Sequence, residues 1–258
     1  MIRIAVTGAA GRMGGAVIET IADREDAQVA FAVDATDEDE VGGVPVHEPE
    51  DFAALLATHE PDAVIDFTIP EAAVGFAEAC AEAGVPLVTG TTGHDDEQFA
   101  ALEAASEDTA VLKATNFARG IQALLRTVEA AVEALPGYDI EVMETHHNNK
   151  RDAPSGTANT ILDTIRESRE FEEVYGREGI QPREEGEIGV HVRRAGDIRG
   201  EHEVMLAGND EVLSLTHHAE DRAVFAAGAV DAAVWLAGKD AGWYDFAAVI
   251  DGSKSEAN

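Results

Sequence analysis

Cysteine, lysine and long apolar runs are scarce in this sequence of 258 residues. The single cysteine, Cys80, can form no internal disulfide, which is typical of a cytoplasmic protein. Its place in a predicted helix favours a small buried core residue. No run of about 18 apolar residues occurs, so we expect no membrane span. The N-terminal sequence also lacks the regions of a signal peptide, and we therefore expect a cytoplasmic protein.

Positive charge is also scarce. The sequence has 18 Lys+Arg against 51 Asp+Glu, a formal net charge of −33. Such a chain repels nucleic acid and anionic membranes, so we expect neither as a partner. The same self-repulsion destabilises the compact state, and about 1 M salt, with a Debye length of about 3 Å, screens most of it. We interpret the composition as adaptation to a salty cytoplasm, as in halophilic archaea. An acidic mesophilic protein is the alternative.

The first half of the chain alternates short apolar strands with amphipathic helices. Pro70 and Gly84 mark the start and end of one helix. This alternation predicts βαβ units, and hence an α/β, Rossmann-like domain with a mostly parallel sheet. The strands are expected at 2–8, 29–34, 62–68, 85–90 and 109–116, and the helices at 14–25, 49–60, 70–84 and 95–108.

After Phe117 the pattern changes to that of an α+β domain with an open mixed sheet. Asn209-Asp210 is expected to join the last two strands as a hairpin. An apolar helix within 221–242, ending near Gly238, is expected to pack back on the first domain. The predicted domains are therefore 1–117 with 220–258, and 118–219. The second is expected to contain helices at 118–135 and 155–170, strands at 138–147, 188–195, 201–208 and 211–219, and a loop at 171–187; a frayed tail is expected at 253–258.

A dinucleotide site is predicted where the first strand meets the first helix. Gly8, Gly11 and Gly14 allow a tight turn and close approach of a pyrophosphate to the helix N-terminus. Asp34 ends the second strand and can accept hydrogen bonds from the adenosine ribose. Ala35 rather than a cation follows Asp34, so the 2′-phosphate of NADPH would meet negative charge, which Arg12 offsets only in part. We therefore expect NADH to serve at least as well as NADPH. The predicted cofactor residues also include Ala9, Ala10, Met13, Gly90, Thr91, Thr92, Ala114, Thr115, Asn116 and Phe117.

Residues 144–157, ETHHNNKRDAPSGT, predict an anion site with proton donors. His146 and His147 suit proton transfer near neutrality, and Lys150 supplies a compact cation. Asp152 could orient any of them, and Ser155 is a candidate N-cap of a helix whose N-terminus favours an anion. No metal site is expected, because the chain has no HExxH or cysteine cluster and His217-His218 stands alone. Ser155 also lacks the GxSxG elbow of a serine hydrolase.

The motifs resemble those of the dihydrodipicolinate reductase (4-hydroxy-tetrahydrodipicolinate reductase) family over nearly the whole chain. The HHxxKxDAPSGT signature is the most specific of them. Ala118 departs from the serine usual in the family, which affects one local hydrogen bond. The matching segments are GAAGRMG (8–14), DFTIPE (66–71), GTTG (90–93), NFARG (116–120), HHNNKRDAPSGTA (146–158), RAGDIRGEH (194–202) and WLAGK (235–239).

The resemblance implies an NAD(P)H-dependent reductase of lysine (diaminopimelate) biosynthesis acting on a cyclic imine dicarboxylate. It also implies that hydride would go to ring C4 and a proton to the neighbouring carbon. His146 would be the acid/base residue and Lys150 a proton donor, with His147, Gly156 and Thr157 binding substrate. The family also implies a substrate-binding and oligomerisation role for the second domain, and a homotetramer. Because the substrate has to be enclosed between two domains, we also expect hinge closure near 116–120 and 218–222. The alternatives are another Rossmann oxidoreductase acting on a small imino or keto acid, and a nucleotide-sensing protein without catalysis.

Overall fold

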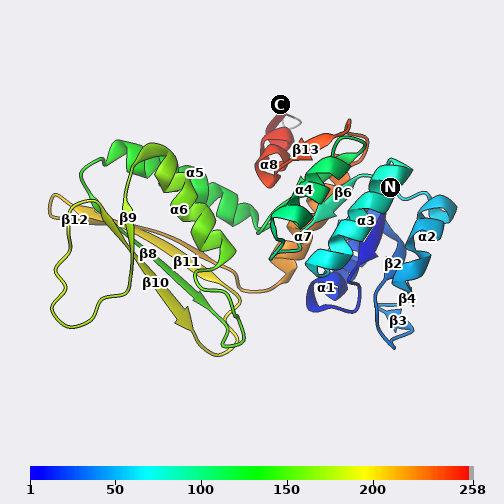
Figure 1. Cartoon of the computed structure of the whole chain (residues 1–258), viewed down its shortest axis with the longest axis horizontal. Coiled ribbons are helices and arrows are strands. Elements are labelled where there is room, and N and C mark those ends of the chain that lie inside the picture. Colours follow the sequence, from blue (N-terminus) through cyan, green and yellow to red (C-terminus); the bar gives the residue numbers. More distant parts are fainter. Residues whose placement is uncertain (256–258) are drawn as a thin grey trace. The chain divides into compact units, whose positions relative to one another are not determined.

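The computed structural model describes residues 1–255 and divides into two compact units (Figure 1). Unit 1 comprises Met1–Ala118 and the chain from Arg222 onward, and unit 2 comprises Arg119–Asp221. These limits lie close to the domain boundaries expected from the sequence. Among the described residues, no helix has both the length and the apolarity needed to cross a membrane.

Unit 1 is built on an eight-stranded sheet in the order β13-β7-β6-β5-β1-β2-β4-β3. Its strand pairs are parallel except β3 with β4. The α/β class and the mostly parallel sheet predicted from the sequence are therefore confirmed. The strands are β1 (Ile2–Thr7), β2 (Ala27–Val33), β3 (Glu40–Val41), β4 (Val44–His47), β5 (Ala63–Asp66), β6 (Leu87–Thr89), β7 (Ala110–Lys113) and β13 (Gly242–Tyr244).

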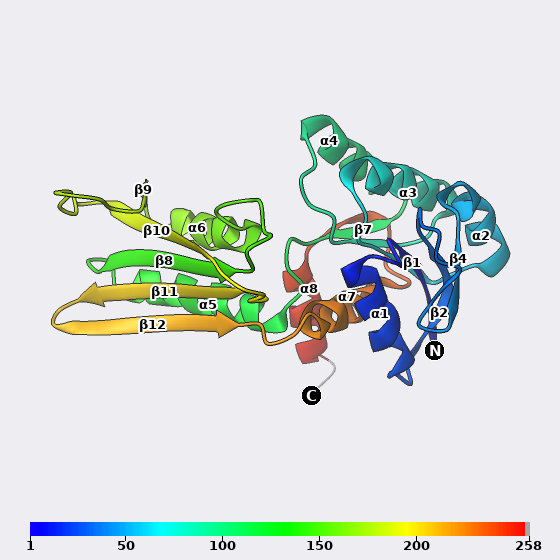
Figure 2. The same ribbon diagram turned by 90° about the horizontal axis from the view of Figure 1, so that it is seen from below.

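Helices cover both faces of this sheet, which explains why its central strands are continuously apolar (Figure 2). Val6 and Ile65 pack in the core beneath α1, α7 and α8. Ala5 and Val64, their neighbours along the strands, pack in the core beneath α2, α3 and α4, because successive side chains point to opposite faces. The helices are α1 (Arg12–Ala22), α2 (Phe52–His59) after the 3-10 turn η1 (Pro49–Asp51), α3 (Pro70–Ala83), α4 (Asp96–Ala105), α7 (Ala223–Leu236) and α8 (Phe246–Ser255).

The helix ends follow the expected capping chemistry. Pro70 begins α3, and Gly84 ends it in the left-handed conformation, with φ of 65°. Asp95 and Gln98 form a reciprocal capping box at α4. Cys80 of α3 is fully buried, and this burial, followed by the charge of Asp66, raises the pKa of its thiol. The interpretation of Cys80 as a core residue is confirmed.

The short elements of unit 1 were not expected. The acidic segment after β2 contains the antiparallel pair β3 and β4, joined by Gly42 and Gly43 with φ of 57° and 82°. The apolar helix expected within 221–242 ends at Leu236, close to its predicted end near Gly238, which has φ of 77°; β13 and α8, which follow it, were not expected. Within the tail expected to be frayed, α8 continues to Ser255, and residues 256–258 lie outside the described residues.

Unit 2 is a five-stranded mixed sheet, in the order β12-β11-β8-β10-β9, with α5 and α6 on one face (Figure 1). The hairpin is confirmed, since Asn209 and Asp210 have φ of 50° and 59° between β11 and β12. The prediction of a loop at 171–187 is wrong in part, because β9 lies within it. The strand was missed because this short, charged edge strand has no buried residue and therefore no apolar pattern. The elements are α5 (Arg119–Ala134), β8 (Asp139–His146), α6 (Gly156–Ser168), β9 (Glu172–Tyr175), β10 (Glu187–Arg194), β11 (Glu201–Gly208) and β12 (Glu211–His218).

Candidate functional site

The turn between β1 and α1 has the close packing that only glycine permits. Gly8 has φ of 74°, and a Cβ there would lie 2.5 Å from the Phe67 carbonyl oxygen. A Cβ at Gly14 would lie 2.0 Å from the Gly8 carbonyl oxygen. Helix α1 follows Gly11 without a side-chain cap and without an acidic residue in its first turn. Its N-terminal N–H groups and dipole therefore favour an anion such as a pyrophosphate.

Asp34 is held against this turn directly after β2. Its Oδ2 accepts a hydrogen bond of 2.8 Å from the Ala10 N–H. Its Oδ1 accepts none from the described part of the chain, which leaves that oxygen for a ribose hydroxyl. Ala35 beside it is exposed. The acid expected at the adenosine end is therefore also a structural part of the turn.

Of the other residues predicted at the strand ends, some pack in the interior and others are exposed. A Cβ at Gly90 would lie 2.1 Å from the Phe67 ring, so this glycine makes room for that ring. Thr91 is buried. Phe117 is buried as well, with its ring centroid 5.8 Å from that of Phe67 and 5.3 Å from that of Phe246. A contribution of Phe117 to nucleotide binding would therefore come from its backbone.

Two backbone N–H groups of the segment that precedes α5 donate hydrogen bonds that hold it in place. The Ala114 N–H donates to the Thr89 carbonyl at 3.2 Å, and the Ala118 N–H donates to Asn116 Oδ1 at 2.8 Å. Ala118 has no exposed surface, so the alanine that departs from the family pattern is packed in the interior. Of the remaining predicted residues, Ala9 and Met13 pack in the core, whereas Arg12, Thr92 and Thr115 are exposed.

These residues fit a bound dinucleotide. The glycine turn and Asp34 lie at the carboxyl ends of β1 and β2. The chain runs from β1 to β2 on one side and later returns to β5 on the other, so the strand order reverses at β1. Ligands of open α/β sheets bind at such a switch point.

In unit 2, His146 is the last residue of β8 and is held by a buried carboxylate. Its Nδ1 lies 2.6 Å from Oε2 of Glu144, whose side chain is fully buried. Arg194 binds the same carboxylate with two hydrogen bonds of 2.7 and 2.8 Å. Burial alone would raise the pKa of Glu144, but the hydrogen bonds from His146 and Arg194 outweigh it and lower the pKa to about 2. Since an ionised carboxylate only accepts, Nδ1 of His146 carries the hydrogen, and Nε2 is the atom that can exchange a proton.

Ser155 and His202 support the same site. The Ser155 hydroxyl accepts a 3.2 Å hydrogen bond from the Ala158 N–H, which confirms Ser155 as the N-cap of α6, and its own N–H donates to Glu144. Nε2 of His202 lies 3.0 Å from the same hydroxyl. Burial, followed by the charge of His146, lowers the pKa of His202 to about 3, so its ring is neutral near pH 7. The His146 and His202 ring centroids are 5.1 Å apart, so positive charges on both rings would repel each other.

Lys150 and His147 belong to the segment between β8 and α6. The Lys150 ammonium lies 2.9 Å from Asp152, so the prediction that Asp152 orients one of these residues is confirmed for the lysine. The Lys150 N–H also donates to the His147 carbonyl at 3.2 Å. At the start of α6, Gly156 is half-buried and Thr157 is buried, and the first turn of the helix has no acidic residue. The predicted residues of this segment therefore lie on one strand end, on the loop that follows it and on one helix start.

Three supporting residues were missed as site residues in the sequence. Glu144 stands two positions before His146 and so lies on the same face of β8, a signal that was available. Arg194 lies opposite His146 in the β10–β8 ladder and His202 opposite Glu144 in the β11–β8 ladder. Those pairings could not be deduced from local patterns. In the described residues, no group of three or more metal-ligating side chains is present.

One unit of this chain is a nucleotide-binding α/β fold, and the other carries a positioned histidine and a lysine. This combination is that of an NAD(P)-dependent oxidoreductase. The sequence matches the family profiles "Dihydrodipicolinate reductase, N-terminus" over residues 2–117 and "Dihydrodipicolinate reductase, C-terminus" over residues 120–250. The chain belongs to the dihydrodipicolinate reductase family.

Named relatives agree with this assignment. A 4-hydroxy-tetrahydrodipicolinate reductase of Haloarcula marismortui is 59% identical over 251 residues, which is 97% of this chain and 100% of the relative. The protein of the same name from Natronomonas pharaonis is 60% identical over 95% of this chain and 98% of its own length. The solved structure of a dipicolinate-bound dihydrodipicolinate reductase from Paenisporosarcina sp. TG-14 has a TM-score of 0.76 and 26% identity, covering 95% of this chain and 97% of that one.

Proposed function

We propose that this protein reduces 4-hydroxy-tetrahydrodipicolinate, or its dehydrated form, to tetrahydrodipicolinate with NADH or NADPH, in the biosynthesis of lysine through diaminopimelate. Family membership supports the reaction class and the substrate. The observation that carries the chemistry is the buried Glu144–His146 pair beside the N-terminus of α6. We also propose that the reaction takes place in the cytoplasm, where reduced pyridine nucleotide is available.

Substrate binding is assigned to the start of α6 and to Lys150. The helix N-terminus favours a carboxylate through its N–H groups at Gly156 and Thr157 and through its dipole. Lys150 supplies a full positive charge for a second carboxylate. Because Asp152 holds that charge at 2.9 Å and is itself more than half exposed, a substrate carboxylate can take its place. His147 is proposed to contribute a further donor.

Proton transfer is assigned to His146. Glu144 and Arg194 fix the imidazole so that Nε2 is the exchanging atom. A reduced nicotinamide, when bound, would supply the hydride that ring C4 of the dehydrated substrate accepts. When the 4-hydroxy form is bound, its hydroxyl group first leaves as water. The carbon next to C4 then takes one proton, which His146 Nε2 or the Lys150 ammonium donates and which solvent restores. Fixing the donor before the reaction removes an entropy cost from this step.

We propose that NADH is used at least as well as NADPH. A 2′-phosphate would meet the Asp34 carboxylate and the exposed acidic run that follows it, Asp37-Glu38-Asp39-Glu40. The exposed Arg12, at the start of α1, offsets this negative charge only in part. The ratio of kcat/KM for the two nucleotides tests this, and a value much larger for NADPH rejects it. Ala35→Arg should raise kcat/KM with NADPH and leave that with NADH nearly unchanged.

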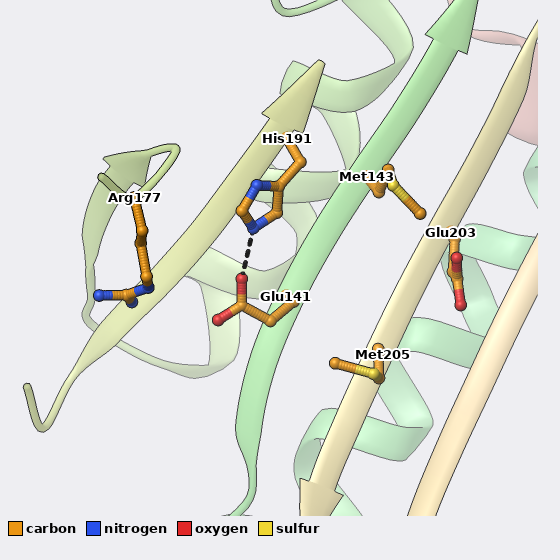
Figure 3. A pocket seen from close by; sticks show the side chains of 6 residues that line it. All are labelled: Glu141, Met143, Arg177, His191, Glu203 and Met205. Atoms are coloured by element: carbon orange, nitrogen blue, oxygen red, sulfur yellow. Dashed lines mark hydrogen bonds and ion pairs between the residues drawn. The ribbon is translucent and has the colours of Figure 1, made fainter. Parts of the chain in front are cut away.

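We also propose a homotetramer that assembles through the face of the unit 2 sheet opposite α5 and α6. Figure 3 shows that face, where Met143 and Met205 lie between charged side chains and His191 Nε2 is 2.7 Å from Glu141 Oε2. Light scattering in molar KCl tests the assembly, and a monomer at assay concentrations rejects it. A hollow of about 450 Å³ on this face is lined by Glu141, Met143, Arg177, His191, Glu203 and Met205, and none of the predicted catalytic residues lies in it.

The reaction itself is tested by loss of NADH absorbance in molar KCl. A dihydrodipicolinate synthase that tolerates the salt generates the unstable substrate during the assay. We expect oxidation of NADH only when the synthase and its substrates are present, and we expect added dipicolinate to inhibit it. No oxidation by a folded protein that binds NADH would reject the proposed substrate and favour a nucleotide-sensing role.

A further inference from the structure

A second buried carboxylate lies in unit 1, away from the residues used above. Asp66 is the last residue of β5, and its side chain is fully buried. Threonine hydroxyls donate four hydrogen bonds to it, two to each oxygen. The donors to Oδ1 are Thr7 at 2.9 Å and Thr68 at 2.6 Å, and those to Oδ2 are Thr89 and Thr91, each at 2.7 Å.

Threonine hydroxyls are the side-chain hydrogen-bond partners of the Asp66 carboxylate. In the described chain it forms no ion pair, in contrast to Glu144, which is paired with Arg194. A buried carboxylate without a cation is costly, and apolar side chains would fill the same layer more cheaply. Two residues earlier on the same face of β5 and β6, Val64 and Leu87 fill the corresponding layer with apolar side chains. The polar row therefore has a role that packing does not require.

Of the four threonines, Thr91 is a predicted cofactor residue, and Thr7 and Thr89 are next to the predicted residues Gly8 and Gly90. Thr7 precedes the Gly8 turn, Thr68 follows Phe67, and Thr89 and Thr91 stand on either side of Gly90. Thr7, Asp66 and Thr89 are neighbours in the ladders of β1, β5 and β6. One carboxylate thus joins the carboxyl ends of three adjacent strands.

The negative charge also sets the direction of the hydrogen bonds in these turns. Because a carboxylate only accepts, the hydroxyls must donate toward it, and their lone pairs remain for backbone groups. Thr91 Oγ1 accepts the Thr68 N–H at 3.0 Å, and Thr89 Oγ1 accepts the Thr91 N–H at 3.2 Å. The Asp66 carbonyl accepts the Gly90 N–H at 2.9 Å. The backbone of residues 68 and 91 is therefore held by hydroxyls that the Asp66 carboxylate orients.

We propose that Asp66 is a positioning residue for nucleotide binding. Its charge holds the Gly8 turn and the Gly90–Thr92 segment in the conformation that the nucleotide meets, without contacting the reacting atoms. The inference rests on nucleotide binding by unit 1 and not on the identity of the substrate.

The main test is Asp66→Asn in the full chain in molar KCl. Whichever way the amide is placed, two of the four hydroxyls face an NH₂ group instead of an acceptor. We expect the Kd of NADH, measured by calorimetry, to rise about tenfold or more. Hydrogen exchange should become faster in residues 8–13 and 90–93 and stay unchanged in the rest of the sheet. Asp62→Asn is the matched control, because Asp62 precedes the same strand, is exposed and accepts the Arg3 N–H at 2.7 Å.

Thr89→Val and Thr89→Ser keep the inference testable if Asp66→Asn does not fold. The valine removes one donor at nearly constant volume, and the serine retains it. We expect the valine variant to weaken NADH binding several-fold and the serine variant to bind as the wild type does. A Kd within twofold of wild type for Asp66→Asn, or for Thr89→Val if the first variant is unfolded, overturns the proposal. So does faster exchange spread over all of unit 1, which would indicate a structural role only. Failure of the wild type to bind NADH would instead reject the proposed function.

Discussion

Glu144→Gln is the substitution that most sharply separates positioning of His146 from nucleotide binding. Glutamine keeps the size of the side chain but presents one acceptor and one NH₂ group where the carboxylate accepts from His146, Arg194 and the Ser155 N–H. The imidazole then loses the partner that fixes its hydrogen on Nδ1. General acid–base catalysis contributes about 10²- to 10⁴-fold, so we expect kcat to fall about 100-fold. The Kd of NADH should not change.

The matched control for this variant is Glu141→Gln. Glu141 lies on the same strand, on the other face, and also holds a histidine, since its Oε2 lies 2.7 Å from His191 Nε2. Both variants are assayed in molar KCl at the same oligomeric state, by NADH oxidation for kcat and by calorimetry for Kd. A kcat for Glu144→Gln within about threefold of wild type would show that the carboxylate does not position the catalytic group.

The same residue predicts how stability depends on pH. The pKa of Glu144 falls from 4.5 to about 2 in the folded protein, which corresponds to about 3 kcal/mol of stability. Because the folded pKa is the lower one, this contribution is complete above pH 4.5 and is lost as the pH falls toward 2. Denaturant titrations of wild type and Glu144→Gln should therefore differ most near neutrality and converge in acid. A difference independent of pH would contradict the linkage.

Three further predictions concern crowding, salt and the buried thiol. A Cβ at Gly200 would lie 3.1 Å from His146 Nε2, so Gly200→Ala should lower kcat about tenfold or more. Gly137→Ala is the control, because a Cβ there meets nothing within 4 Å and kcat should not change. Equal effects of the two substitutions on kcat would refute this prediction. With a net charge of −33, the melting temperature should rise toward molar KCl, and a flat or falling series argues for an acidic mesophilic protein. Cys80, buried and with a raised pKa, should react with a thiol reagent only after unfolding, and rapid reaction of the native protein would contradict its burial.

Much of the fold could be predicted from the sequence because its signals are local. Alternating apolar strands and helices predicted the parallel sheet, and Asn209-Asp210 predicted the hairpin. Ser155 was recognised as a helix cap from its neighbours alone. The missed elements, such as β9 and β13, are short edge strands without a buried residue, so they produce no apolar periodicity.

Only some of the residues that hold His146 in place could be predicted from the sequence. Glu144 shares a strand face with His146 and could have been found by spacing. Arg194 lies about 50 residues away in sequence and reaches Glu144 only through the pairing of β10 with β8. Asp66 resembled any other polar residue at a strand end, because its four threonine partners come from three different strand ends.

The most direct test of the account compares kcat with NADH binding in His146→Ala. If the residues at the end of β8 carry the proton transfer, turnover in molar KCl should fall at least about 100-fold, while the Kd of NADH stays at the wild-type value. Turnover close to wild type in this variant would contradict the assignment of His146.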